Sequence, residues 1–424
     1  MSDANLLIEP LPTGWENCRF ADLCDRVKDS YKPVEGGDTP YVGLEHIAQG
    51  FPVFVGRGAE RDIKSSKTAF KVGDILFGKL RPYLRKGAQA DFNGISSTDI
   101  LVFRAQDRCE AEFLKYLVHT DEFISHAKST TSGVQHPRTS WPSLREFKLS
   151  LPPLPEQKKI AHILSSVQRA IEAQERIIET TTELKKALMN KLFTEGLRGE
   201  PQKQTEIGPV PETWEVVELG TLFEKPPQNG IYKHKSEYGS GTQILRIDDF
   251  SNDGEVVISA RNLVALDRSE TETYGLEPGD IVINRVNSLS HLGKTALIGL
   301  IGDEMVFESN MMRFSVDESQ VLKEYIFKFL NSPLTKKQII GSAKRAVAQS
   351  SINQGDVRAI IVPKPTIEEQ NNVVEAFDAI EAQIDHSTDK VAVLLDLFRT
   401  LLHELMTAKT RVHDLEISPK GSAA

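Results

Sequence analysis

The feature that most constrains the fold of this chain is a long heptad-patterned stretch that occurs twice, 213 positions apart. The same shift places Glu156-Gln157 over Glu369-Gln370 near the start of each copy, and the copies end near residues 194 and 407. Taken at alternating steps of four and three, nine of ten positions are apolar in the second copy and seven of ten in the first. Each copy therefore predicts a helix of about 40 residues, roughly 60 Å long.

The start of each helix carries its own signals. Thr366 with Glu369 three residues later matches a capping box, and Pro155 suits a first helical position, where its missing N–H costs nothing. A continuous heptad pattern in one shared register is typical of a coiled-coil seam, so we interpret the pair as a rigid spacer. The alternative is two ordinary amphipathic helices buried in unrelated domains, but such helices average far shorter.

Composition limits the class of protein. A chain of 424 residues is long enough for two or three domains. Three cysteines are too few for a disulfide framework and favour a reducing compartment. No apolar run reaches the length of a membrane span, and the first residues lack the basic region of a signal peptide. We therefore expect a cytoplasmic protein.

The charge is unevenly distributed. The net charge is −9, yet residues 61–86 hold eight Lys or Arg against two acidic residues, and residues 323–345 hold six against one. Basic patches on an acidic body are compatible with DNA binding, while an acidic helical stalk is compatible with docking onto a protein partner.

A module with shared landmarks precedes each helix. Both modules open with a Pro three residues before a Trp-Glu pair, at Trp15 and at Trp214. Both contain a Gly-Asp turn followed by an apolar run that reads as a strand, at residues 72–77 and 278–283. The order is thus module, helix, module, helix, which is an internal repeat.

Polar and basic segments follow the predicted strands and also come just before the end of each module. Loops that leave a strand often carry binding groups, and Arg and Asn are side chains that form paired contacts with guanine and adenine edges. The simpler interpretation is a solvated strand end with assorted charges. The candidate DNA-binding residues are Lys79, Arg81, Tyr83, Arg85, Lys86, His136 and Arg138 in the first module, and Arg285, Asn287, Lys294, Lys344, Arg345, Gln349 and Asn353 in the second.

Signals for an enzyme are weak. Residues 288–295 resemble the end of a phosphate-binding loop, but Ser288 stands where the first Gly belongs, and the apolar residues that follow predict a strand where a helix is required. The cysteines and histidines show no metal-ligand spacing, and the dinucleotide-binding glycine pattern is missing. We predict a chain without catalytic residues or a metal site of its own.

This order of elements resembles the DNA-specificity subunits of type I restriction–modification systems. The resemblance rests on residues 151–157 (Leu-Pro-Pro-Leu-Pro-Glu-Gln), on the weaker match at 362–370, on the Pro-x-x-Trp entries and on the Gly-Asp-Ile strands. It implies a mixed α+β fold with two globular α/β target-recognition domains, separated by two long antiparallel coiled-coil helices in a pseudo-twofold repeat. The implied boundaries are 1–150 for the first domain, 151–197 for the first spacer helix, 198–210 for a linker, 211–361 for the second domain, 362–415 for the second spacer helix and 416–424 for a tail.

The resemblance also implies a function. Each domain would recognise one half of a split, asymmetric site in double-stranded DNA, and the helices would dock two methyltransferase subunits. Those partners would carry S-adenosylmethionine and methylate adenine, and restriction subunits would use ATP and Mg²⁺ to translocate and cleave unmodified DNA. This chain itself would bind no cofactor. The alternative is a coiled-coil scaffold that does not recognise DNA.

Overall fold

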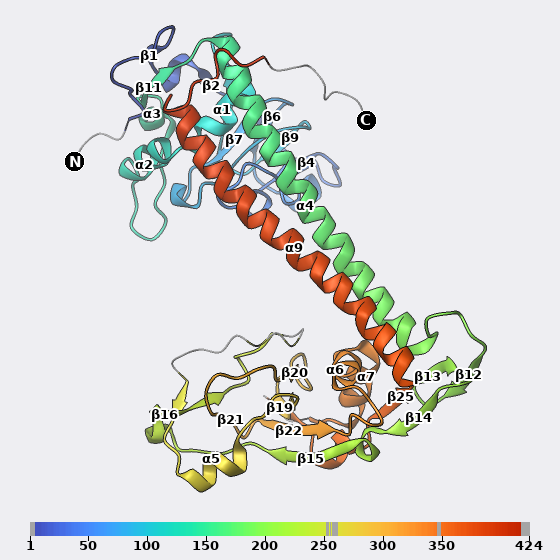
Figure 1. Cartoon of the computed structure of the whole chain (residues 1–424). Coiled ribbons are helices and arrows are strands. Elements are labelled where there is room, and N and C mark those ends of the chain that lie inside the picture. The colour runs from blue at the N-terminus through green and yellow to red at the C-terminus, as the bar shows by residue number, and fades with distance from the viewer. Residues whose placement is uncertain (1–4, 252–253, 255, 257–261, 346–348, 417–424) are drawn as a thin grey trace. The chain divides into compact units, whose positions relative to one another are not determined.

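The computed structural model describes residues 5–416 apart from 252–253, 255, 257–261 and 346–348. The chain forms two compact units, one made of Met1–Glu175 with Thr388–Ala424 and the other of Arg176–Ser387. Each unit contains one α/β module and one half of each of two long helices (Figure 1). The predicted mixed α+β class with two repeated modules is confirmed.

The two long helices are α4, Leu154–Thr194, and α9, Ile367–Met406. In the first unit, Leu164 from the start of α4 shares a core with Phe398 from the end of α9. In the second unit, Phe193 from the end of α4 stacks on Phe377 from the start of α9 at 5.7 Å between ring centroids. The two helices are therefore antiparallel within each unit.

The predicted seam is confirmed along both helices. Each of the twenty heptad positions is buried or partly buried, including those in the first copy that are not apolar. Lys185 is one of these, and its ammonium lies 3.0 Å from the Glu381 carboxylate. Ser387 is fully buried and accepts a hydrogen bond from Gln383 at 3.3 Å. Polar residues fit in this seam because a neighbour on a facing or adjacent turn satisfies them.

The first module contains three sheets and three short helices. Its four-stranded sheet has the order β2-β10-β7-β8, its five-stranded sheet has the order β3-β6-β9-β4-β5, and β1 pairs with β11. The elements are β1 Glu16–Arg19, β2 Cys24–Arg26, β3 Ser30–Tyr31, β4 Pro40–Val42, β5 Gly58–Ala59, β6 Lys67–Phe70, β7 Ile75–Gly78, β8 Gly87–Gln89, β9 Gly94–Ser96, β10 Ile100–Ala105, α1 Ala111–Leu117, α2 Asp121–Ser129, α3 Trp141–Leu144 and β11 Lys148–Leu151.

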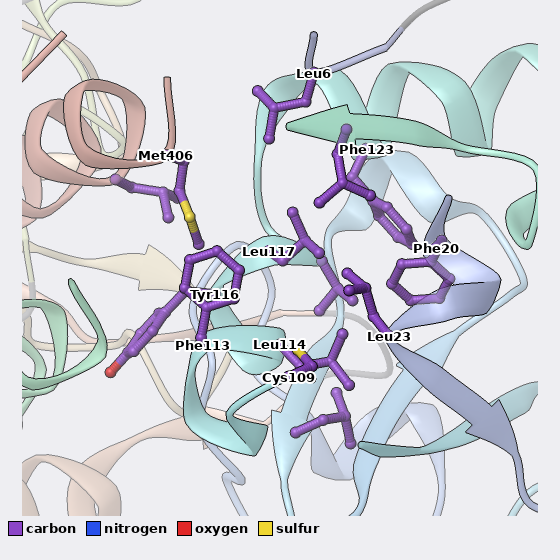
Figure 2. Packing of buried hydrophobic residues seen from close by; sticks show 14 of the residues in the cluster. Leu6, Phe20, Leu23, Cys109, Phe113, Leu114, Tyr116, Leu117, Phe123 and Met406 are labelled. Atoms are coloured by element: carbon purple, nitrogen blue, oxygen red, sulfur yellow. The ribbon is translucent and has the colours of Figure 1, made fainter. Parts of the chain in front are cut away.

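An aromatic core joins this module to the helices of its own unit. Phe20 packs edge-on against Phe103 with ring centroids 5.2 Å apart, and Phe123 lies 4.9 Å from Phe20. On the other side of the cluster Tyr116 of α1 faces the end of α9, where Met406 is buried (Figure 2). Burying side chains of this size contributes about 1.5–3 kcal/mol each, so the helix ends are part of the module's core.

The second module repeats the plan with different peripheral strands. Its four-stranded sheet, β15-β22-β18-β20, matches β2-β10-β7-β8 strand for strand, and β14 pairs with β25 as β1 pairs with β11. The other sheets are β17-β16-β21 and β19-β24-β23. The elements are β14 Glu215–Glu218, β15 Phe223–Asn229, β16 Tyr238–Leu245, β17 Leu263–Val264, α5 Arg268–Tyr274, β18 Ile281–Asn284, β19 Val286–Asn287, β20 Thr295–Leu297, β21 Met305–Phe307, β22 Met311–Val316, α6 Lys323–Leu330, α7 Pro333–Ser342, β23 Lys344–Arg345, β24 Ser350–Ser351, α8 Gln354–Arg358 and β25 Ile361–Lys364.

The Gly-Asp turns work in the same way in both modules. Gly73 has φ +90°, which favours glycine. Asp74, the next residue, is buried and receives two hydrogen bonds from the Arg104 guanidinium, at 2.8 and 2.7 Å. In the second module Asp280 is paired with Arg313 at 3.5 Å. The turn therefore buries a carboxylate that binds an arginine of the neighbouring strand.

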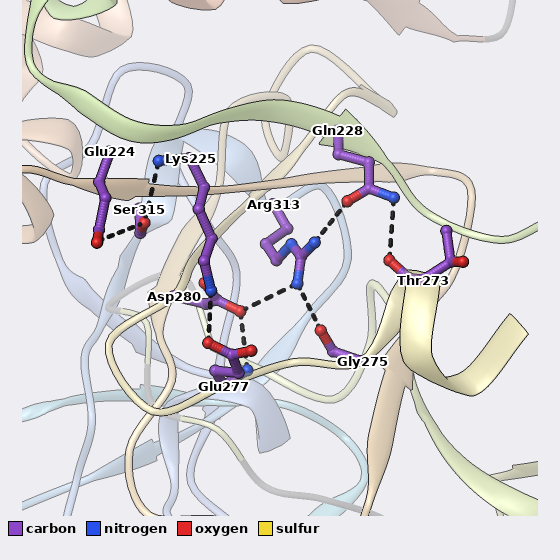
Figure 3. A network of polar contacts seen from close by, with 9 residues as sticks. All are labelled: Glu224, Lys225, Gln228, Thr273, Gly275, Glu277, Asp280, Arg313 and Ser315. Carbon is purple, nitrogen blue, oxygen red and sulfur yellow. Dashed lines mark hydrogen bonds and ion pairs between the residues drawn. The ribbon is translucent and has the colours of Figure 1, made fainter. Parts of the chain in front are cut away.

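Arg313 is the centre of a wider polar network in the second module (Figure 3). Its guanidinium also donates to the Gly275 carbonyl and to the Gln228 side chain, each at 2.5 Å. Burial raises the pKa of Asp280, although Arg313 and the Glu277 backbone N–H act in the opposite direction. The network ties β15, β18 and β22 to the end of α5.

The repeated Glu-Gln motif has a structural purpose that explains its place at the start of each helix. Gln157 accepts a hydrogen bond from the Glu110 backbone N–H at 2.8 Å and donates to the carbonyls of Arg108 and Pro152 at 3.0 and 2.9 Å. Gln370 accepts from the Leu322 N–H at 2.8 Å and donates to a proline carbonyl at 2.9 Å. Each buried amide thus fastens the start of a short module helix, α1 or α6, to the start of a long one.

Glu156, beside the first of these glutamines, anchors the segment after α9. Its carboxylate accepts from Trp15 Nε1 at 3.0 Å and from the Arg411 guanidinium at 2.7 and 2.9 Å. Burial alone would raise the pKa of Glu156, but the hydrogen bonds from Arg411 and Trp15 hold it below its usual value. The start of the first module and the C-terminal segment are therefore joined through one carboxylate.

The segment predicted as a linker, residues 198–210, contains regular structure. Strands β12, Gln202–Thr205, and β13, Gly208–Pro211, form an antiparallel hairpin. Gly208 has φ +109°, and the Thr205 hydroxyl donates to its carbonyl at 2.6 Å, which closes the turn. The hairpin was not predicted, because the segment is polar in composition and its turn depends on a single glycine.

Candidate nucleic-acid interface

In the first module, the loop after β7 meets the polar segment that precedes α3. Leu80 and Arg138 form an isolated antiparallel bridge. The Arg81 N–H donates to the Pro137 carbonyl at 2.8 Å, and the Thr139 N–H donates to the Lys79 backbone carbonyl at 3.0 Å. Two segments that are 58 residues apart in the sequence, measured from Leu80 to Arg138, therefore form one surface.

The second module contains the same junction. There β19 pairs with β24, with Val286 opposite Ser351. Val286 is 206 positions after Leu80, the offset between the Gly-Asp strands, and Ser351 is 213 positions after Arg138, the offset between the long helices. The bridge is thus equivalent in the two modules, although the residues that form it differ.

Four of the first module's candidates have polar groups without a hydrogen-bond or ion-pair partner, although Lys79 and His136 add to the effect of Arg138 in lowering the pKa of Asp99. Lys79, Arg81, Tyr83 and His136 make no side-chain hydrogen bond or ion pair with any residue that the structure describes. Arg81 is exposed and has φ +50°, and the Tyr83 side chain is 48% exposed. Free cationic, aromatic and imidazole groups around one junction can bind phosphate and base edges.

The other candidates of the first module are used inside the protein. Arg138 donates to both carboxylate oxygens of Asp99, at 2.9 and 3.3 Å, and this hydrogen bonding lowers the pKa of Asp99. Arg85 donates to the His119 carbonyl at 3.2 Å and is paired with Asp121. Both arginines position the loops and have less capacity left for a ligand.

Lys86 and Lys294 are equivalent structural residues. Lys86 donates to the Leu44 carbonyl at 2.6 Å. Lys294 donates to the carbonyls of Ile247 and Phe250, both at 2.6 Å, and its burial lowers its pKa. Each lysine precedes a strand, β8 or β20, and holds the loop that follows β4 or β16. We therefore leave both out of the proposed DNA surface.

The second module's candidates also divide into free and engaged groups. Arg285 donates to the Ser309 carbonyl at 3.1 Å. Asn353 caps α8, because its side-chain oxygen accepts hydrogen bonds from the N–H groups of Gly355 and Asp356 at 2.7 and 3.2 Å. Lys344 and Gln349 are exposed, and their side chains make no hydrogen bond or ion pair with any residue that the structure describes. Asn287 is half-buried, and its oxygen accepts from the next backbone N–H at 2.7 Å. Arg345 lies in β23, and its side chain is outside the described part of the chain.

Sequence reasoning missed two groups at these junctions. Asp99, which orients Arg138, lies 39 residues away from it, and no local pattern indicated the pair. Asn284, the last residue of β18, is fully buried, and neither atom of its amide has a partner among the described residues. Asn284 was within reach of prediction, because an amide directly follows three apolar strand residues.

The described residues contain no group of three or more histidine, cysteine or acidic side chains that could hold a metal ion. None of the helices in the same residues is long and apolar enough to cross a membrane. Residues 295–297 form strand β20, as predicted, so the partial phosphate-loop pattern has no helix after it.

Two related modules, each with a paired loop and hairpin and each followed by a long helix, define a tandem-module DNA-binding subunit. The sequence matches the model of the type I restriction modification DNA specificity domain over residues 12–182 and again over 211–395. The chain therefore belongs to the family of type I restriction–modification DNA specificity subunits.

Characterised specificity subunits align with most of this chain. The specificity subunit of the type I restriction enzyme MjaVIII from Methanocaldococcus jannaschii is 28% identical and aligns over 96% of this chain and 95% of its own length. The EcoKI specificity subunit of Escherichia coli K12 is 22% identical over 76% of this chain and 72% of its own. A solved type I restriction–modification S subunit from M. genitalium has a TM-score of 0.54 at 16% identity, covering 96% of this chain and 99% of that one, and so shares the fold.

Proposed function

We propose that this chain recognises a split, asymmetric site in double-stranded DNA, with each module contacting one half of it. The observation that supports this most directly is the repeated junction, Leu80 with Arg138 and Val286 with Ser351. One scaffold presents two surfaces whose free groups differ, which is what two unlike half-sites require. Lys79 and Arg81 of one surface contrast with Lys344 and Gln349 of the other.

The free groups suggest how the work is divided. Lysine and arginine at the loops bind phosphates, which supplies salt-dependent affinity without sequence information. Amide and aromatic side chains beside them, such as Gln349 and Tyr83, contact base edges and supply specificity. The antiparallel helices then fix the distance between the half-sites, as a dimer fixes half-sites on a duplex.

The helices also offer a surface for protein partners. Ile177 and Leu184 of α4 are 37% and 51% exposed, and Val393 and Leu397 of α9 are 68% and 43% exposed. We propose that two methyltransferase subunits cover such positions, carry S-adenosylmethionine and methylate adenine in each half-site. Restriction subunits would add ATP- and Mg²⁺-dependent translocation and cleavage. The assembly would act in the cytoplasm, and this chain would contribute recognition without catalysis.

A selection experiment tests the proposal. The chain would be combined with its methyltransferase subunits and used to select from random-sequence duplexes, followed by footprinting. Recovery of two separated short sequences supports recognition of a split site. Binding without any enriched sequence would instead favour a scaffold that does not recognise DNA.

A pair of variants tests the surface itself. Replacing Lys79 and Arg81 together by Ala should reduce the slope of log affinity against log salt by about one to two, because each lost phosphate contact removes roughly 0.9. Arg26→Ala is the matched control, since Arg26 is exposed on β2 and its side chain makes no hydrogen bond or ion pair with the described residues. An equal change in slope for the control and the double variant would contradict the placement of the interface.

A further inference from the structure

Residues 132–138 of the first module form a hairpin with a fixed base and an exposed tip, which we call the polar hairpin. Ser132 and Arg138 exchange both backbone hydrogen bonds, at 2.9 and 3.0 Å. The Arg138 side chain is tied to Asp99, and the hairpin is joined to the β7 loop through Leu80. The base is thus held from three sides.

The tip of the polar hairpin carries an apolar side chain in full contact with solvent. Val134 is 100% exposed, and Gly133 before it has φ +90°, which turns the chain outward. Gln135 and His136 beside it are also exposed, and their side chains have no hydrogen bond or ion pair to any described residue. Single exposed apolar residues are common on protein surfaces, so exposure alone does not identify a contact.

Two further observations single out this valine. The base of the hairpin lies beside Lys79 and Arg81, the two cations of the proposed DNA surface, because the Arg81 N–H donates to the Pro137 carbonyl and the Thr139 N–H donates to the Lys79 carbonyl. The shift of 213 that places Ser351 over Arg138 also places Val347 at the position of Val134, while Gln135 and His136 become Ala348 and Gln349. Val347 lies outside the described residues, so the repeat is one of sequence. The two modules differ at the polar positions and keep the valine.

We propose that the polar hairpin enters the major groove of the first half-site and that Val134 contacts the 5-methyl group of a thymine there. The inference rests on the proposed function. The major groove, about 12 Å wide, admits a two-stranded ribbon, and the polar hairpin presents two chain segments joined by the bridge between Ser132 and Arg138. The thymine methyl is the apolar group that the major groove displays, and a valine methyl is its natural counterpart. Gln135, the next side chain, is then placed to contact the neighbouring base edge, and the two cations bind phosphates on the groove wall.

The test removes one methyl group at a time from the DNA. Once the half-sites are known, each thymine of the first half-site is replaced in turn by deoxyuridine, and affinity is measured for the chain in complex with its methyltransferase subunits. One replacement should weaken binding about fourfold, the value for one buried methyl group. Val134→Ala should weaken binding to thymine DNA severalfold and should lose its sensitivity to deoxyuridine at that same position only. Val72→Ala is the matched control, because Val72 is 60% exposed in the same module, away from the junction.

The possible outcomes distinguish a failure of the methyl contact from a failure of the proposed function. If selection yields two half-sites but Val134→Ala binds as the unmodified chain does, or remains as sensitive to deoxyuridine, the methyl contact is wrong and split-site recognition stands. A first half-site without thymine on either strand overturns the contact equally. A rise in 2-aminopurine fluorescence that depends on Val134 would indicate insertion between base pairs and would also overturn it. If no sequence is selected at all, the proposed function itself fails.

Discussion

The two buried glutamines allow a reciprocal test of how each module is attached to its helix. Gln157→Met keeps a similar volume and removes the amide, so the Glu110 N–H and the Arg108 and Pro152 carbonyls lose their buried partner. Each of these three unsatisfied groups costs about 1–3 kcal/mol, so the expected loss is roughly 3–9 kcal/mol. Gln370→Met leaves two buried groups without a partner and should cost roughly 2–6 kcal/mol.

Native-state hydrogen exchange measured by mass spectrometry can resolve the two units in the intact chain. Gln157→Met should lower the opening free energy of amides in α1 and leave those in α6 unchanged, and Gln370→Met should do the reverse. Gln49→Met is the control, because Gln49 is exposed and its side chain makes no hydrogen bond within the described part of the chain. Equal losses in α1 and α6 for either variant, or a loss below about 1 kcal/mol, would refute the role given to the amides.

Two other predictions concern the first unit. Burial lowers the pKa of His119 from 6.5 to about 4, so the unfolded chain binds a proton more readily than the folded one between these values, and stability should fall as pH falls through this window. The loss should reach about 2 kcal/mol at pH 5, measured by urea denaturation, and His119→Gln should remove it; an unchanged pH dependence in the variant would contradict this. Arg411→Met should destabilise the same unit by about 2–3 kcal/mol. This is less than the cost of a buried charge without any partner, because Trp15 still donates a hydrogen bond to Glu156. Amides after α9 should then exchange faster, and unchanged slow exchange there would show that the ion pair does not hold the segment.

The long helices and the repeated plan could be predicted because their signals add up over many residues. A heptad pattern over 40 positions is read from side-chain types alone, and the Gly-Asp turns announce themselves through glycine. The structure supports both, down to Lys185 and Ser387, which occupy seam positions that would otherwise be apolar. Features that depend on residues within a single helix or turn could therefore be predicted from the sequence.

The division between free and engaged basic residues could not be predicted. Lys79 and Lys86 lie in one loop and look alike in sequence, yet the Lys86 ammonium binds the carbonyl of Leu44, 42 residues earlier. Arg138 and Arg81 differ in the same way, since Asp99 neutralises only Arg138 among these two. Such partners come from tertiary contacts, which no pattern within the loop encodes. The assignment of individual contacts to DNA remains a prediction.

The pairing of β1 with β11 and of β14 with β25 has a consequence for how such chains diversify. In each module the strand by which the backbone enters lies next to the strand by which it leaves, with Glu16 opposite Leu151 and Glu215 opposite Lys364. The residues between these strands form a cassette whose two ends lie side by side, so its replacement leaves the length and heptad phase of both helices unchanged, provided that the side chains that pack on the helix ends, such as Tyr116, are kept. Genetic exchange within one cassette could therefore change the DNA sequence that is recognised without changing the distance between the two half-sites.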